Sequence, residues 1–189
     1  GLIVYLSIKY RKYPVILLSV GQTALGIWTE FRFPMQPACH MQIDSLSMLM
    51  CIIAAFIGGL ICIYAVGYMK AYHQHHKEFQ DRSGFFFSML FLFLAAMFGL
   101  VLSENLIWMY FFWEVTSVIS FLLIGYTRTE EAVNNSFRAL WMNLVGGFGF
   151  AIAIAVAAAT LGTVQLEAVV QTGAVIPVAL LALAGLTKS

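Results

Sequence analysis

Long apolar runs separated by short charged stretches make up most of the sequence. A helix needs about 20 apolar residues to cross the hydrocarbon core of a bilayer, and charge-free runs near that length recur along the chain. The pattern predicts seven membrane segments, at 1–8 (partial), 13–29, 45–69, 83–103, 105–126, 132–160 and 173–189 (partial). The predicted fold class is therefore all-α, a polytopic transmembrane helical bundle that forms a single domain over residues 1–189.

The first and last predicted segments are each too short to cross a bilayer. Residues 1–8 are too few to span, and the seventh segment stops at Ser189 after about two-thirds of a crossing at ~1.5 Å per residue. We therefore expect a chain truncated at both ends, with further helices after Ser189.

The composition indicates that the solvent of this chain is lipid. Apolar residues make up 61% and charged residues 10%, with a mean hydropathy of +0.88, whereas soluble domains are about half apolar and about a quarter charged. The net charge of +1 argues against nucleic acid as a partner, because nucleic acid needs a basic face. Cys39, Cys51 and Cys62 lack CxxC spacing, so neither a disulfide framework nor a metal site is expected.

Basic residues gather in alternate predicted loops. They are Lys9, Arg11 and Lys12 in the first loop, Lys70, Lys77 and Arg82 in the next, and Arg128 in the third, with Arg138 just inside the helix that follows. The opposite loops hold only Arg32. Because positive loops stay in the cytoplasm, the pattern predicts a multi-pass protein of the inner (cytoplasmic) membrane, with loops 9–12, 70–82 and 127–131 cytoplasmic and Glu104 outside.

Glu114 is an acidic residue near the middle of the fifth predicted segment. It lies roughly 14 Å past Asn105 at 1.5 Å per residue. An ionisable group at that depth costs about 2.5–3.5 kcal/mol, so it is expected to face protein and to have a partner. Ser103, Tyr110 and Ser117 are predicted to share its helix face. Burial raises the pKa of a carboxyl group and a nearby cation lowers it, so a carboxyl group under both influences can take up and release a proton. The alternative is a static contact that holds two helices together.

Lys188 and Arg138 are the candidate partners. Lys188 lies deep in the seventh segment, where a desolvated lysine loses its charge readily; the alternative is a side chain that reaches the cytoplasmic surface. Arg138 opens the sixth segment with Glu131 and Asn134 on nearly the same face. An arginine holds its charge, so it can tune neighbours electrostatically but cannot relay a proton, and a surface anchor is an equal alternative.

Three histidines, His73, His75 and His76, lie in the predicted polar loop. Metal binding is one interpretation, but there is no second cluster of ligands, so a solvated loop is the simpler one. Glu78 and Asp81 of the same loop are candidates for contact with a partner subunit.

Gly146, Gly147 and Gly149 in the sixth segment favour close packing of another helix, and Asp44 is placed where the helix dipole favours a negative charge. The sequence contains no Walker loop, Rossmann glycine pattern, haem CxxCH or cysteine cluster. We therefore expect no cofactor and no metal in this chain.

Four segments together resemble one family: Ile43–Ser47 (IDSLS), Tyr64–Met69 (YAVGYM), Leu102–Tyr126 (LSENLIWMYFFWEVTSVISFLLIGY) and Gly185–Ser189 (GLTKS). The chain resembles the proton-translocating membrane subunits of respiratory complex I (subunit-5 type), the large subunits of Mrp-type Na⁺/H⁺ antiporters, and the related subunits of membrane-bound hydrogenases. The resemblance covers nearly the whole chain from Ile43 on, and the pair Trp113-Glu114 is its most specific part.

The resemblance implies roles for three residues. Glu114 matches the family's essential glutamate and Lys188 its central lysine, which form a charge pair whose opening and closing gates proton passage. Arg138 falls where complex I subunits carry a basic residue at the start of the sixth helix. Family members contain two inverted repeats of five helices, so this chain is expected to hold the first half of such a bundle, with the site among discontinuous helices.

The function expected from the resemblance is proton translocation by a complex I-like NADH:quinone oxidoreductase or a membrane-bound hydrogenase. Partners would be other membrane and peripheral subunits, which would hold flavin and iron–sulfur clusters or a NiFe centre. An Mrp-type antiporter subunit is the alternative, and a structural membrane anchor is a second. Complex I chains often carry aspartate where this sequence has Gly147; that departure, together with Thr116-Ser117, leans toward the antiporter and hydrogenase branches.

Overall fold

The computed structural model describes residues 2–10, 12–33, 41–75 and 81–188. Regular structure in these ranges is helical throughout, which confirms the predicted all-α, polytopic bundle. The helices are α1 (Leu2–Lys9), α2 (Tyr13–Arg32), α3 (Ser45–His75), α4 (Ser83–Leu102), α5 (Leu106–Ile124), α6 (Glu130–Leu161), α7 (Leu166–Gln171) and α8 (Val175–Lys188). Helices are expected in lipid because they satisfy every backbone hydrogen bond within one segment.

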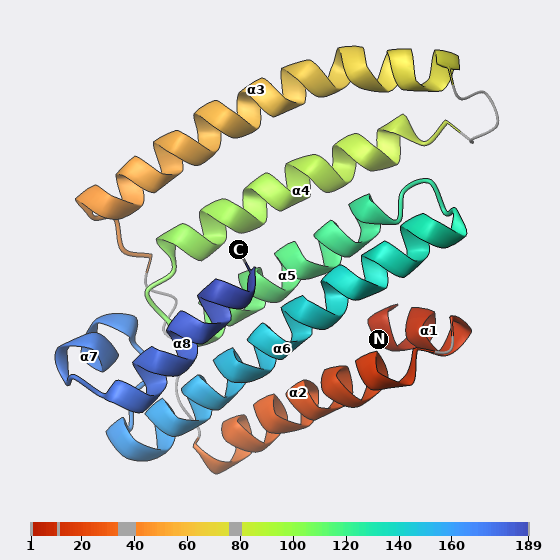
Figure 1. Cartoon of the computed structure of the whole chain (residues 1–189). Helices are drawn as coiled ribbons and strands as arrows, with labels where there is room; N and C mark the ends of the chain where they lie inside the picture. The colour runs from red at the N-terminus through yellow and green to blue at the C-terminus, as the bar shows by residue number, and fades with distance from the viewer. Residues whose placement is uncertain (1, 11, 34–40, 76–80, 189) are drawn as a thin grey trace.

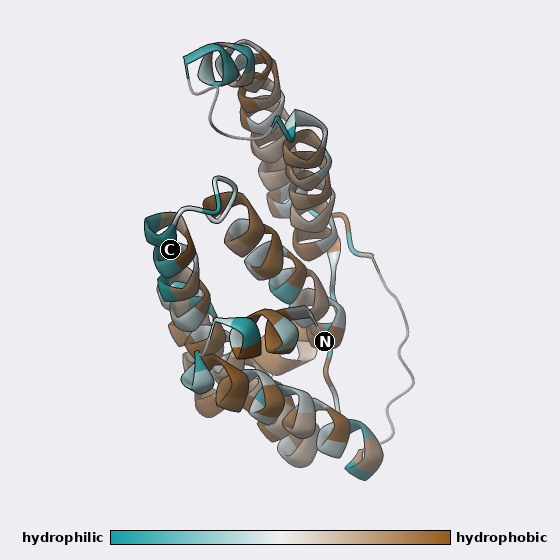
Figure 2. Ribbon diagram, turned by 90° about the vertical axis from the view of Figure 1, so that its right-hand side faces the viewer, coloured by the Kyte–Doolittle hydropathy of each residue, from teal (hydrophilic) through white to brown (hydrophobic). Residues whose placement is uncertain are grey.

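The long helices lie side by side in an order that differs from their order in the sequence. In space the series runs α3, α4, α5, α6, α2, and α8 packs on α6 at the centre (Figure 1). The α1–α2 junction, the start of α4 and the α5–α6 connection lie at one end of the bundle, while the α4–α5 and α6–α7 connections lie at the other. Hydrophobic residues cover the middle of the helices and hydrophilic residues gather at their ends (Figure 2).

Side chains of the connections fix where several helices begin. The Asn105 side chain accepts a hydrogen bond from Ile107 N (2.8 Å) at the start of α5, and Thr129 accepts one from Ala132 N (3.2 Å) at the start of α6. At the start of α3, Asp44 Oδ1 accepts from Ser47 N (2.7 Å), and Ser47 Oγ accepts from Asp44 N (2.8 Å). These bonds, the side-chain bond from Ser47 first, hold the pKa of Asp44 below its ordinary value.

Four of the described helices, α3 to α6, are long and apolar enough to cross a membrane. The predicted segment 13–29 lies in α2, which also has 20 residues but is interrupted by polar side chains and is not among these four. α3 continues to His75, so helix occupies the first part of the predicted loop 70–82. The short helix α7 was not predicted, and it lies between the left-handed residues Gly162 (φ 66°) and Gly173 (φ 63°).

Two clusters of buried side chains hold the centre of the bundle together. One joins the start of α5, the second half of α6, α7 and α8, and it includes Leu106, Phe150 and Val169. The other joins α2, the end of α5 and the first half of α6, and it includes Phe121 and Leu140. The candidate site lies between these two clusters along α5 and α6.

Candidate functional site

Glu114 lies on α5 against the side chain of Gln22 from α2 and the backbone of Gly147 from α6. A Cβ atom added at Gly147 would collide with both Gln22 Nε2 and Glu114 Oε1, so the glycine makes the space that these two side chains occupy. Gln22 is buried, with 5% of its surface exposed, and its Nε2 donates a hydrogen bond to Leu144 O (3.1 Å). Three helices therefore meet at the carboxylate.

Lys188 reaches the same region of α5 from α8. Its Nζ donates to Ser117 Oγ (2.6 Å) and to the backbone carbonyl of Trp113 (3.5 Å). The same nitrogen lies 5.0 Å from the centre of the Trp113 ring, in the range of a cation–π contact. The ammonium group therefore rests on α5 beside Glu114, with a hydroxyl, a carbonyl and an aromatic face as its partners.

The structure brings Glu114 and Lys188 together but does not join them in an ion pair. Among the described residues, the salt-bridge contact within 4.0 Å is His73–Asp81, while the charges of Glu114 and Lys188 act on each other without direct contact. Glu114 Oε1 is buried and has no hydrogen-bond partner in the described part of the chain. A buried polar atom left in this state costs about 1–3 kcal/mol.

Two adjacent glycines on α6 let neighbouring helices pack closely against two different faces of the same turn of α6. A Cβ added at Gly146 would collide with Thr187 Oγ1 of α8 and would lie 3.3 Å from Ala184 O. Gly147 faces α2 and α5 instead, because successive residues of a helix point about 100° apart. The glycine pair thus allows α8, which carries Lys188, and α5, which carries Glu114, to pack close to the same turn of α6.

Hydroxyl groups of α5 surround the carbonyl of Trp113. Thr116 Oγ1 (2.7 Å) and Ser117 Oγ (3.0 Å) both donate to it, in addition to the longer contact from Lys188. Ser103, predicted to share the face of Glu114, lies before the start of α5 and donates to Gly99 O (2.6 Å), because the chain turns at Glu104 and Asn105. That prediction is wrong.

Arg138 lies away from this site. It is exposed and borders a surface pocket with Lys12, whose Nζ donates to Asn134 Oδ1 (3.1 Å). Nine residues, or about 14 Å along α6, separate it from Gly147. The structure therefore does not bring Arg138 to Glu114, and any influence of its charge acts over distance.

The structure changes the histidine prediction. His73 and His75 belong to α3 rather than to a loop; His75 is exposed, whereas the side chain of His73 is 14% exposed. Its Nδ1 donates to Met69 O (2.8 Å), and its Nε2 lies 3.3 Å from Tyr126 Oη and 3.6 Å from Asp81 Oδ1. His76 and Glu78 lie outside the described residues. No group of three potential metal ligands occurs in the described ranges.

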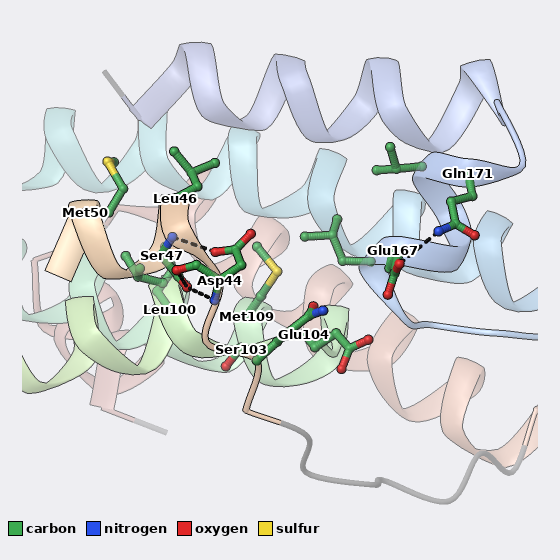
Figure 3. Close-up of a pocket in the computed structure, with 14 residues that line it drawn as sticks. Asp44, Leu46, Ser47, Met50, Leu100, Ser103, Glu104, Met109, Glu167 and Gln171 are labelled. Atoms are coloured by element: carbon green, nitrogen blue, oxygen red, sulfur yellow. Dashed lines mark hydrogen bonds between the residues drawn. The ribbon is translucent and has the colours of Figure 1, made fainter.

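A pocket of about 590 Å³ opens where α3, α4, α5 and α7 meet (Figure 3). Three carboxylates line it, from Asp44, Glu104 and Glu167. Two of them already have partners, because Asp44 caps α3 and Glu167 accepts a hydrogen bond from Gln171 Nε2 (2.8 Å). The pocket lies at the end of the bundle opposite the basic loops.

Gln22 is the site residue that the sequence interpretation missed. A signal was present, because Gln22 is an amide near the middle of a charge-free predicted span, where a polar group needs a partner. Its partners come from residues more than 90 positions away, so the sequence could not name them.

The fold and the site define a class of protein: a multi-helix membrane bundle with a half-buried carboxylate and a half-buried lysine beside each other. Two family models match the chain. "NADH-Ubiquinone oxidoreductase (complex I), chain 5 N-terminus" matches residues 28–80, and "NADH:quinone oxidoreductase/Mrp antiporter, TM" matches residues 103–188. Together they cover well over half of the chain, which therefore belongs to the antiporter-like family shared by complex I and Mrp antiporters. It is a multi-pass membrane protein.

Curated relatives include the Na⁺/H⁺ antiporter subunit A1 of Staphylococcus haemolyticus, 37% identical over 108 residues. The subunits A1 of Staphylococcus aureus strains JH9 and Newman are each 35% identical over 108 residues. In each case the match covers 57% of this chain but 12% of the relative. The chain thus corresponds to a small part of these longer proteins.

Proposed function

We propose that this chain is the part of an Mrp-type Na⁺/H⁺ antiporter large subunit that takes up and releases the transported proton. Glu114 is the group that binds the proton, and Lys188 controls its charge. The similarity to antiporter subunits A1 supports this branch of the family over the others. Gly147 lies directly against Glu114, so the position at which complex I chains often carry aspartate belongs to the site itself.

The observation that carries the proposal is the contact of Lys188 with Ser117 rather than with Glu114. Ser117 lies three residues, or about one helical turn, beyond Glu114. With the ammonium group on Ser117, burial favours a protonated, neutral Glu114. When the ammonium group moves to Glu114, its positive charge favours the ionised carboxylate, and the proton leaves. The lysine would therefore alternate between two partners on α5.

We place the protein in the cytoplasmic membrane of a bacterial cell, with the basic loops 9–12, 70–82 and 127–131 on the cytoplasmic side. The positive-inside rule supports this orientation, as does the position of the α1–α2 junction, the start of α4 and the α5–α6 connection at one end of the bundle (Figure 1). The remaining membrane subunits of the antiporter would be the partners.

The test is Glu114→Gln in the full-length gene, expressed in antiporter-deficient cells and assayed in inverted membrane vesicles. Na⁺-dependent collapse of a pH gradient is expected to fall about 100-fold or more, since one positioned acid–base group contributes roughly 10²–10⁴-fold. Glu131→Gln, an exposed carboxylate at the start of α6, is the matched control and should exchange normally. Normal exchange by an assembled Glu114→Gln variant would reduce Glu114 to a structural contact and overturn the proposal.

A second candidate is a proton-translocating subunit of a complex I-like NADH:quinone oxidoreductase or a membrane-bound hydrogenase. The match of residues 28–80 to the complex I chain 5 model favours it. In that case the partner subunits would hold flavin and iron–sulfur clusters or a NiFe centre. Purification of the intact complex decides between the two: redox subunits in stoichiometric amounts support this candidate, while Na⁺-dependent exchange without them supports the antiporter.

A further inference from the structure

A groove of about 450 Å³ lies on the surface of the bundle, where the start of α2 meets the first half of α6. It is at the end of the bundle that carries the basic loops (Figure 1). Lys12 and Arg138 border it, and no carboxylate is among the described residues that line it. Arg138, which the structure places away from Glu114, therefore belongs to a basic groove instead.

The two cations lie beside each other, with Asn134 between them. Lys12 Nζ donates to Asn134 Oδ1 (3.1 Å), and Arg138 follows Asn134 by four positions, on the same face of α6 and about 6 Å further along the helix. The bond to Asn134 uses one of the three N–H groups of the ammonium. The guanidinium of Arg138 makes no hydrogen bond or ion pair with the described residues. Most of these donors therefore remain available to an anion.

The rest of the groove is apolar and extends away from the basic loops. Val15 and Phe137 are buried in it, whereas Trp141 and Met142 are 41% and 60% exposed along its side. Trp141 lies about one helical turn beyond Arg138. Tryptophan concentrates at membrane–water interfaces, where its polar N–H and its apolar ring both find partners. The groove therefore has a cationic end, followed by an apolar body that begins at an interfacial aromatic residue.

We propose that this groove binds an anionic phospholipid of the leaflet on the side of the basic loops. Lys12 and Arg138 hold the phosphate group, and the acyl chains lie along the exposed side chains of Trp141, Leu17 and Val145. The planar fork of an arginine matches the oxygens of a phosphate, and basic pockets between membrane helices on the cytoplasmic side bind anionic head groups. A lipid held in this way bridges α2 and α6.

Two other occupants fit the groove less well. Free phosphate would satisfy the cations but would leave the apolar body uncovered. An apolar helix of another subunit would bury Lys12 and Arg138 without a counter-charge, which is costly. Glu131, the acidic residue of α6 nearest to Arg138 in the sequence, is seven positions or about 10 Å away along the helix and forms no ion pair with it. The phosphate of a lipid supplies the missing charge.

The test uses full-length protein in a neutral detergent. It is titrated with a short-chain phosphatidylglycerol, and the rise of its melting temperature gives an apparent dissociation constant. The double variant Lys12→Gln/Arg138→Gln should bind about 25-fold more weakly, at about five-fold for each cation. Lys70→Gln/Arg128→Gln is the matched control, because it removes one exposed lysine and one exposed arginine that do not line the groove. It should bind like the wild type.

Three results of this titration would overturn the proposal. The first is wild-type affinity in Lys12→Gln/Arg138→Gln. The second is equal binding of phosphatidylcholine with the same chains, which would show that the charge of the head group has no effect. The third is inorganic phosphate that raises the melting temperature as much as the lipid does, since the ligand would then be free phosphate. None of these measurements involves ion exchange, so they are independent of the proposed function.

A second measurement identifies the occupant in the assembled protein. A photoreactive amino acid replaces Met142 in the groove or, as the control, Val66, which is 62% exposed on α3. After irradiation in native membranes, adducts at Met142 should be enriched in anionic phospholipid, whereas those at Val66 should follow the composition of the whole membrane. Equal lipid composition at both positions would overturn the proposal. An adduct of Met142 with another polypeptide would also overturn it, because a protein helix would then cover the groove.

Discussion

α6 and α3 are almost equally long, at 32 and 31 residues, and both are apolar enough to cross a membrane. Their surroundings differ sharply. Of the most apolar stretch of each helix, 56% of residues are buried in α6 and 11% in α3. α6 contacts α2, α5 and α8, while α3 packs against α4 at the edge of the bundle (Figure 1).

The size of the side chains, rather than their hydrophobicity, separates the two helices. The buried positions of α6 include Gly146, Gly147, Ala153 and Ala157, whereas α3 exposes isoleucine, leucine, phenylalanine and tyrosine on most of its surface. In lipid there is little hydrophobic force between helices, so small residues that permit close approach decide which helices pack. Close approach in turn places Glu114 and Lys188 beside each other, and α3 supplies no residue to that site.

The largest expected effect comes from placing the same side chain on both helices. Gly146→Val should separate α6 from α8, because its Cβ would collide with Thr187. Overpacking of this kind costs about 1–3 kcal/mol, so the melting temperature of the detergent-purified protein and its exchange rate should both fall. Gly59→Val on α3, where an added Cβ meets no atom within 4 Å, should leave both unchanged. Equal effects of the two substitutions would contradict the comparison.

A smaller effect is expected from substitution of Gln22, which would test whether the polar contacts around Glu114 serve transport. Gln22→Leu keeps the size of the side chain but removes the amide beside Glu114, so the exchange rate should fall several-fold with an altered pH profile. Gln22→Asn, which keeps an amide on a shorter side chain, should retain more activity than Gln22→Leu. The control is Gln171→Leu, an exposed glutamine of α7. A pH profile identical to that of the wild type in Gln22→Leu would show that the amide only supports packing.

The smallest effect concerns the contact of α3 with the start of α4. A hydrogen bond from the Ser83 backbone N–H (2.9 Å) holds the pKa of Asp81 below its ordinary value, and His73 lies 3.6 Å away. Because the pKa of Asp81 is lower in the folded state than in the unfolded state, its ionised carboxylate stabilises the fold at a pH above the ordinary pKa. This stabilisation is lost as the pH falls through the pKa of the folded state. Asp81→Asn should therefore lower the melting temperature slightly at neutral pH, and the difference from wild type should vanish in acid.

The control for Asp81 is Glu131→Gln, which removes an exposed carboxylate that belongs to α6 rather than to the α3–α4 contact. A stability difference for Asp81→Asn that persists unchanged in acid would show that the charge of Asp81 contributes nothing to the contact.

The sequence predicted the fold class and the position of Glu114 within the fifth long helix, because charges in a membrane protein collect at the ends of helices. It did not predict the last turns of α3, since polar residues at 70–75 resemble a loop, although a helix can continue past the bilayer. α7 was missed because its six residues are too few for a periodic pattern to appear.

The site was predicted in parts. Glu114 is recognisable because an acidic residue in an apolar run is rare. The contact of Lys188 with Ser117 joins residues 71 positions apart, and nothing local to either residue indicates it. Ser103 was assigned to the wrong helix, because periodicity was extended across the turn at Glu104 and Asn105 where the helix is interrupted.

The position of the Lys188 ammonium group also makes Trp113 an intrinsic optical probe. The ammonium nitrogen lies 5.0 Å from the centre of the indole ring, and the indole N–H is buried without a hydrogen-bond partner among the described residues. The electric field of a positive charge at that distance alters the energy of the indole's excited state, and departure of the charge removes the field. The emission of Trp113 would therefore record each displacement of the lysine, without any label attached to the protein.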